Sequence, residues 1–101
     1  MPSLNVRAVK LEELGGDVIT LAGASVQVTT LPRRADSFQI KARAGDVYYE
    51  MNGTVASANS PGYVAQNTGS FEGPIAGLER LDVFGAQGAF AHIIFYREHV
   101  A

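Results

Sequence analysis

Two histidines are the side chains in this sequence best suited to proton transfer or metal binding. His92 lies inside an apolar run, and His99 follows seven residues later. A zinc site needs three or four convergent ligands, and the sequence holds no third histidine and no cysteine. We interpret His92 as a hydrogen-bonded strand histidine; the alternative is a general base that needs a partner. We expect no metal site and no cofactor.

Five carboxylates are the candidates for an acid and base pair: Asp46, Glu50, Glu72, Glu79 and Asp82. Asp46 and Glu50 are four residues apart, so on one strand they share a face at a separation of about 13 Å. Glycoside hydrolysis uses carboxyl groups roughly 5–9.5 Å apart. We therefore interpret these residues as solvated strand faces and turn ends.

Motifs for nucleophilic or phosphate chemistry are absent from the sequence. It contains no G-x-S-x-G elbow, no S-x-x-K motif and no glycine-rich phosphate loop. Asn52, Gly53 and Thr54 match a glycosylation sequon, but Asn-Gly is also a common turn pair. We interpret this site as a turn, and we predict that the protein is not an enzyme.

Alternation of apolar and polar residues dominates the chain from residue 17 onward. Along residues 37–43, for example, Phe38, Ile40 and Ala42 share one face and polar side chains share the other. This period of two is typical of half-buried antiparallel strands. Turn residues recur at intervals of roughly 8–12 residues, as in sandwiches and small barrels. The predicted strands lie near residues 17–21, 25–31, 37–43, 46–52, 62–66, 69–72, 79–84 and 89–97.

These elements predict an all-β fold: a small antiparallel β-sandwich, jelly-roll-like, of about eight short strands. The strand order cannot be obtained from the pattern. The predicted core is formed by Val28, Phe38, Ile40, Val47, Tyr49, Leu81, Val83, Ile93 and Phe95.

The last predicted strand is apolar on both faces, which indicates that both are covered. One face can be the core of the domain. The other face needs a second sheet, the N-terminal segment or another subunit. We predict that it forms an oligomer interface of Phe90, His92, Ile94 and Tyr96.

Residues 1–16 do not alternate strictly, and we separate them from the sandwich domain at residues 17–101. Lys10 to Leu14 fit either an extended segment or one helical turn. The segment either caps the sheet of its own domain or forms an arm that packs on a neighbouring copy.

Composition excludes several partners for this chain of 101 residues. Apolar residues make up 47% and charged residues 18%, which is typical of a globular domain. The net charge of −2 and the scattered basic residues argue against nucleic-acid binding. No apolar run approaches the ~20 residues that span a bilayer, and residues 1–16 lack the layout of a signal peptide. We expect no membrane partner and synthesis in a cytoplasm.

Several stretches resemble small structural proteins of tailed bacteriophages. They are residues 35–40, 46–53, 56–58 before 60–64, and 72–75 leading to 81–84, and the similarity lies in their rhythm rather than in a chemical motif. The resemblance implies a β-sandwich of the capsid cement, decoration or head-fibre type on the virion surface. It implies the major capsid protein as partner and a homo-oligomer, with a trimer favoured, but no functional residues. Residues 1–31 lie outside it.

We therefore expect a structural virion protein of a tailed phage, made in the host cytoplasm, that binds the capsid exterior and stabilises it. The alternative is a carbohydrate- or ligand-binding β-sandwich, for which Tyr48, Tyr63 and Tyr96 are the candidate stacking residues. A cupin-like enzyme is disfavoured because the chain has only two histidines.

Overall fold

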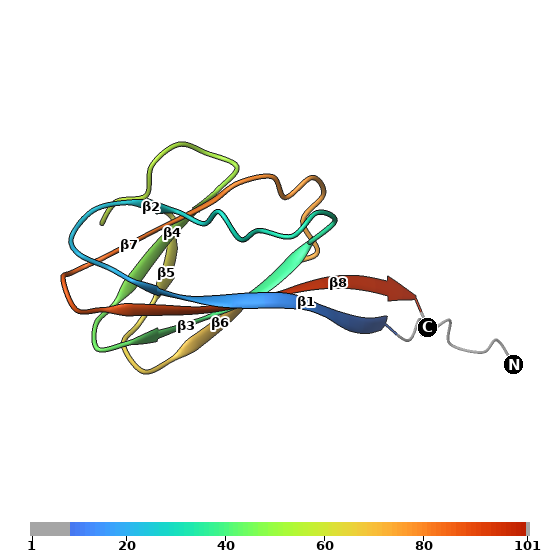
Figure 1. Cartoon of the computed structure of the whole chain (residues 1–101), viewed down its shortest axis with the longest axis horizontal. Coiled ribbons are helices and arrows are strands. Elements are labelled where there is room, and N and C mark those ends of the chain that lie inside the picture. Colours follow the sequence, from blue (N-terminus) through green and yellow to red (C-terminus); the bar gives the residue numbers. More distant parts are fainter. Residues whose placement is uncertain (1–8, 101) are drawn as a thin grey trace, which may run out of the picture.

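The computed structural model describes residues 9–100, which fold into two four-stranded antiparallel sheets packed face to face (Figure 1). Sheet A has the order β1-β8-β3-β6 and sheet B the order β2-β7-β4-β5. This is the strand order of a jelly roll, so the predicted all-β sandwich is confirmed. In this part of the chain, no helix is long and apolar enough to cross a membrane. The strands are β1 (Val9–Thr20), β2 (Val26–Gln27), β3 (Ser37–Arg43), β4 (Val47–Met51), β5 (Gly62–Val64), β6 (Gly69–Glu72), β7 (Leu81–Gly85) and β8 (Phe90–Val100).

The core lies between the sheets and contains all nine predicted residues, each at most 4% exposed. The ring of Phe38 on β3 meets Tyr49 on β4 edge to face, with centroids 5.6 Å apart. It also packs against Phe95 on β8, at 6.4 Å. The alternation of apolar and polar residues predicts these core positions correctly, because every second residue of a strand points to the same face of the sheet.

Two strands differ in length from their predictions. The strand predicted over 25–31 is reduced to β2, although Val28 still donates a hydrogen bond to the carbonyl oxygen of Leu81 at 2.8 Å. The chain then leaves the sheet and turns at Pro32, whose carbonyl accepts from the N–H of Ala35. The predicted strand ends early because Thr29 and Thr30 form a turn directly after Val28, so the alternation of Val26 and Val28 does not continue to residue 31.

β1 crosses the boundary predicted at residue 16. Residues 9–16 form its first part, pair with β8 and are extended, so Lys10 to Leu14 do not form the alternative helical turn. The register shifts between Glu13 and Gly15, which is a β-bulge. The remaining part of the predicted segment, residues 1–8, lies outside the described residues. Tertiary pairing with β8 decides the conformation here, because the bulge breaks the alternation that sequence reasoning relies on.

Candidate functional site

The outer face of sheet A is the first candidate surface, and we call it the β8 face. The four predicted interface residues do share this face, because Ala91, Ile93 and Phe95 between them point into the core. All four are half-buried. Two exposed apolar side chains flank them, Val18 on β1 at 53% exposure and Phe71 on β6 at 43%. The β8 face consists of Val18, Phe71, Phe90, His92, Ile94 and Tyr96.

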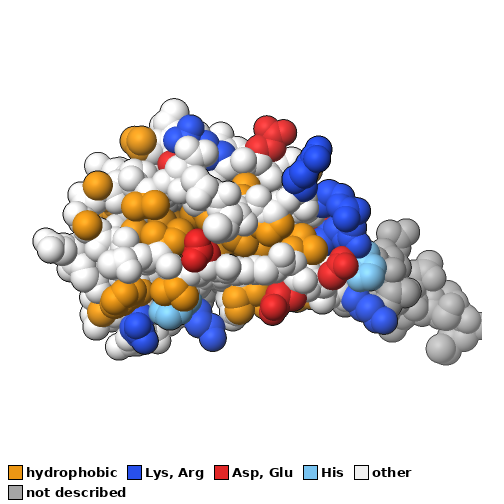
Figure 2. Space-filling view, in the orientation of Figure 1, with side chains coloured by type: hydrophobic (Ala, Val, Ile, Leu, Met, Phe, Trp, Pro, Cys, Tyr) orange, Lys and Arg blue, Asp and Glu red, His pale blue; other side chains and the backbone are white. Residues whose placement is uncertain are grey.

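Neighbouring strands partly cover this row in the folded chain. The guanidinium of Arg43 lies 4.9 Å from the centroid of the Phe90 ring, and the Tyr96 ring packs on Phe71 at 6.1 Å. Lys41 stands opposite His92 and Gln39 opposite Ile94, so β3 adds long polar side chains beside β8. Figure 2 shows hydrophobic side chains, a histidine and basic side chains together along the lower edge of the molecule.

A shallow hollow opens in the β8 face where β1 carries Gly16. Gly16 stands opposite Ile94, and a Cβ at this position would collide with the carbonyl oxygen of Ile93. The close approach of the two strands therefore requires glycine, and the missing side chain leaves a depression. The hollow is bordered by Val18, Lys41 and His92, among other residues.

His92 does not have the surroundings of a catalytic base. The interpretation of His92 as a hydrogen-bonded strand histidine does not hold at Nε2, which is buried without a hydrogen-bond partner, so no carboxylate orients the ring through that nitrogen. It points outward from sheet A rather than into the sandwich, where a cupin-like metal centre would lie. Among residues 10–99, no three histidine, aspartate or glutamate side chains gather in a way that could hold a metal ion.

Three of the five predicted carboxylates, Asp46, Glu72 and Asp82, accept hydrogen bonds from other groups of the fold. Asp46 accepts a hydrogen bond from the N–H of Gln66 at 2.8 Å and one from the hydroxyl of Tyr63 at 3.2 Å. Glu72 accepts from the hydroxyl of Tyr49 at 2.8 Å, which joins sheet A to sheet B. Burial and this hydrogen bond raise the pKa of Tyr49 to about 12.

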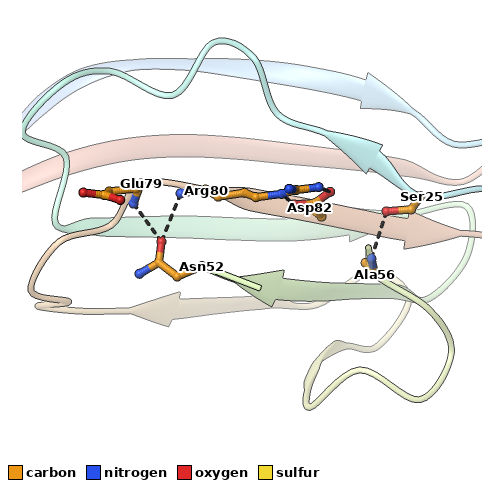
Figure 3. A network of polar contacts seen from close by, with 6 residues as sticks. All are labelled: Ser25, Asn52, Ala56, Glu79, Arg80 and Asp82. Carbon is orange, nitrogen blue, oxygen red and sulfur yellow. Dashed lines mark hydrogen bonds and ion pairs between the residues drawn. The ribbon is translucent and has the colours of Figure 1, made fainter. Parts of the chain in front are cut away.

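The interpretation of Asp82 as a solvated carboxylate is wrong, because its side chain is buried. It is 1% exposed on β7, directly opposite Glu50 on β4, and it accepts two hydrogen bonds from Arg80, at 2.7 and 3.1 Å (Figure 3). These bonds raise the pKa of the Arg80 guanidinium above its ordinary value. The spacing of Arg80 and Asp82 could have indicated this ion pair in the sequence, since residues i and i+2 of an extended chain share a face. The paired carboxylate suits a structural role.

Asn52 holds the chain that leads into this ion pair. Its Oδ1 atom accepts hydrogen bonds from the N–H groups of Glu79 and Arg80, at 2.8 and 3.0 Å (Figure 3). Its Nδ2 atom donates to the carbonyl oxygen of Gly77 at 2.9 Å. Asn52 has a φ of 53°, a left-handed conformation that asparagine tolerates well in turns. The turn interpretation of this site therefore has a structural basis.

The outer face of sheet B carries a second candidate surface, a row of three aromatic rings. Tyr48 on β4 lies between Tyr63 on β5 and Phe84 on β7, with centroid distances of 5.2 and 6.3 Å. Tyr63 is 51% exposed. Tyr48 and Tyr63 were candidates from the sequence. Phe84 joins them only because β7 and β5 are the two neighbours of β4.

No protein-family model matches the chain, and no similar curated protein or solved structure was found.

The two surfaces differ in the contacts they can make. The β8 face combines apolar side chains with polar side chains of β3, which lies between β8 and β6, and with a shallow hollow; aromatic side chains of this kind are enriched at protein interfaces. The row of Phe84, Tyr48 and Tyr63 offers ring faces and two tyrosine hydroxyls to a flat ligand.

Proposed function

We propose that this protein is a structural component of a tailed-phage virion that binds the capsid exterior and stabilises the shell. The observation that carries the proposal is the β8 face, an apolar row along one sheet with Val18 and Phe71 exposed at its sides. Exposed apolar side chains in one continuous patch mark interaction sites in monomeric domains.

A protein partner suits this surface better than a small ligand does. Small-molecule sites are concave and bury most of the ligand, whereas the hollow beside Gly16 is wide open to solvent. Gln39, Lys41 and Arg43 of β3 lie between the β8 row and Phe71 on β6, so polar side chains stand among the apolar ones. Protein interfaces have this mixed composition, since as a whole they are only about as apolar as the rest of a protein surface.

Two considerations favour a virion as the location. The chain resembles small phage structural proteins in the rhythm of its strands and turns. Viral capsid domains are among the known users of the jelly-roll fold. The second consideration is an analogy of fold, which supports a virion role without specifying the partner.

Co-sedimentation with capsids of the phage that encodes the chain tests this proposal. We expect the protein to sediment with the capsids, and the double variant Val18→Glu, Phe71→Glu to remain in the supernatant. Both side chains are exposed, so the variant should fold. Val55→Glu is the matched control, because Val55 is 65% exposed and lies on the connection between β4 and β5 of the other sheet. Equal sedimentation of the double variant and the control would contradict docking through this face.

Carbohydrate binding is the second candidate, and the row of Phe84, Tyr48 and Tyr63 favours it. Aromatic faces stack on the apolar side of pyranose rings, and the Tyr63 hydroxyl, held by Asp46, adds a polar contact. A glycan array with the unmodified protein and the Tyr63→Ala variant tests it. Binding that is lost in the variant would support this function, and an empty array would remove it.

A further inference from the structure

β1 and β8 extend beyond the sandwich as a two-stranded ribbon (Figure 1). The pairing of β3 with β8 begins at Ser37 opposite Tyr96, so β8 beyond Tyr96 pairs with β1 alone. In the ribbon, Arg97 stands opposite Glu12 and His99 opposite Lys10. β1 is also the edge strand of sheet A, and within residues 9–100 no other strand pairs with its outer side. The ribbon therefore presents a free strand edge.

The hydrogen-bonding direction of each residue on this edge follows from its neighbours. The carbonyl oxygen of Tyr96 accepts from the N–H of Asp36, and the N–H of Glu98 donates to the Asp36 carboxylate. Tyr96 and Glu98 thus direct backbone groups away from β1. Since direction alternates along an antiparallel pair, the residues opposite them, Glu13 and Leu11, direct their N–H and C=O groups outward from β1.

Farther along the strand, the same edge is protected. The N–H of Val18 is hydrogen-bonded to the carboxylate of its neighbour Asp17 at 2.8 Å, and Thr30 donates to the same carboxylate at 3.2 Å. The bulge between Glu13 and Gly15 separates this part from the ribbon. Side-chain caps and bulges are common ways to block an edge strand. The unblocked part is therefore the ribbon around Leu11.

We propose that β1 pairs with β1 of a second copy in antiparallel orientation, with Leu11 opposite Leu11 across a two-fold axis. Leu11 is 48% exposed, and the pairing would cover it with its own counterpart. The outward N–H and C=O groups of Leu11 and Glu13 would find partners on the second strand. The result is one continuous sheet through both copies, closed by two-fold symmetry.

Charge selects this register over its neighbours. With Leu11 opposite Leu11, Lys10 of each copy stands opposite Glu12 of the other, which makes two pairs of opposite charge. The outward N–H and C=O groups of the two strands can pair only if one strand is shifted by an even number of residues. A shift of two residues in one direction places Lys10 opposite Lys10, and a shift of two in the other places Glu12 opposite Glu12. Like charges directly opposite destabilise an antiparallel pair. Glu12 already holds Arg97 at 2.7 Å, so the charges would alternate across the joined strands.

The shape of the molecule permits the contact. Because the ribbon projects from the sandwich and the strands run antiparallel, the second sandwich would lie beyond the far end of the first ribbon (Figure 1). The pairing does not depend on the proposed function. It also leaves the β8 face free, and it differs from the trimer predicted through that face.

Sedimentation velocity of the full chain is the first test. We expect a dimer of two 10.7 kDa chains. The Leu11→Pro variant should be monomeric, since its missing N–H points outward and the ladder to β8 stays intact. Leu11→Thr, which keeps the N–H and suits a strand, is the matched control and should still dimerise. A monomer of the unmodified chain at about 100 μM would overturn the proposal.

Cysteine cross-linking tests the register directly, because the chain has no cysteine of its own. Leu11→Cys places two thiols across the two-fold axis, within reach of a disulfide. Oxidation should yield a covalent dimer. Glu13→Cys is the control and should not cross-link, because its counterpart is four residues away along the strand. Equal cross-linking of both variants, or of neither, would overturn the proposed register.

A charge exchange gives an independent check. Lys10→Glu and Glu12→Lys should each raise the dimer dissociation constant about tenfold or more, because each places like charges opposite one another. Mixing the two variants should restore pairing, since every charge then faces its opposite. Dimerisation that survives these changes and Leu11→Pro, yet fails with Phe90→Ser and Ile94→Ser, would assign self-association to the β8 face and overturn the proposal.

Discussion

Single side chains in this protein hold the two sheets together. Tyr49 reaches from β4 across the sandwich to Glu72 on β6, at 2.8 Å. Its ring packs in the core while its hydroxyl meets a half-buried carboxylate at the margin. A tyrosine on the inner face was predicted from alternation, but its partner lies 23 residues away and required the tertiary structure.

The raised pKa of Tyr49 makes stability depend on pH at high pH. Burial and Glu72 favour the protonated hydroxyl in the folded state, where the pKa is about 12, against 10.0 ordinarily. The contribution of the Tyr49 hydroxyl to the free energy of unfolding is therefore complete below pH 10 and is lost as the pH rises from 10 to 12. We expect the stability difference between the unmodified protein and Tyr49→Phe to shrink over this range. Urea unfolding at several pH values measures it, and a constant difference would contradict the assignment.

Substitution of Ile40 tests the assignment of the core. It is 0% exposed on β3, and Ile40→Asp would bury a charge without a partner at a cost of several kcal/mol. A domain of this size has a total stability of ~5–15 kcal/mol, so we expect no soluble folded protein. Ile40→Val is the control and should fold. A folded, cooperative Ile40→Asp variant by circular dichroism would contradict the assigned core.

Among the elements, the connections depend on a few polar groups rather than on regular pairing. Asn52 directly follows β4, and its side chain binds the backbone of residues 77, 79 and 80 with three hydrogen bonds. Those residues lead into β7, where Asp82 must meet Arg80. A single asparagine thus positions both a turn and the start of a central strand.

Replacement of Asn52 separates its backbone conformation from its hydrogen bonds. Asn52→Gly keeps the left-handed φ but removes all three bonds, and we expect a loss of about 1–2 kcal/mol in unfolding free energy. Asn52→Asp retains the acceptor for Glu79 and Arg80 and should lose less. Thermal unfolding of both variants shows which one loses more unfolding free energy. Equal losses would show that the hydrogen bonds to Oδ1 contribute nothing to stability.

At the scale of the whole molecule, one sheet has an apolar outer face and a projecting edge. The β8 face is half-buried by Arg43 and other side chains of β3, so the monomer shields it in part. The predicted trimer through Phe90, His92, Ile94 and Tyr96 stays a prediction. The free edge around Leu11 is a separate surface of the same sheet.

The double variant Phe90→Ser, Ile94→Ser examines the β8 face as a whole. Both side chains point away from the core, so we expect a folded domain with a melting temperature lowered by a few degrees. Capsid co-sedimentation should be lost. Unfolding would instead show that the face is part of the core, and unchanged co-sedimentation would show that the capsid docks elsewhere.

The fold class, the number of strands and the core could all be predicted from local patterns along the chain. Val47, Tyr49 and Met51 could be assigned to one face because alternation is a local property, read from adjacent residues. The turn at Asn52 could be located from its Asn-Gly pair, and this residue has a positive φ.

The identity of neighbouring strands could not be predicted in this way, because it depends on pairing between distant segments. β1 pairs with β8 through contacts such as Arg97 to Glu12, 85 residues apart, and no local pattern encodes such a distance. The same holds for the row of Phe84, Tyr48 and Tyr63, which needs β4 between β5 and β7. Both candidate surfaces and the free edge are consequences of strand order. Strand order follows from hydrogen-bonded pairing between strands that are far apart in the sequence. It is therefore fixed only when the whole chain folds into the sandwich.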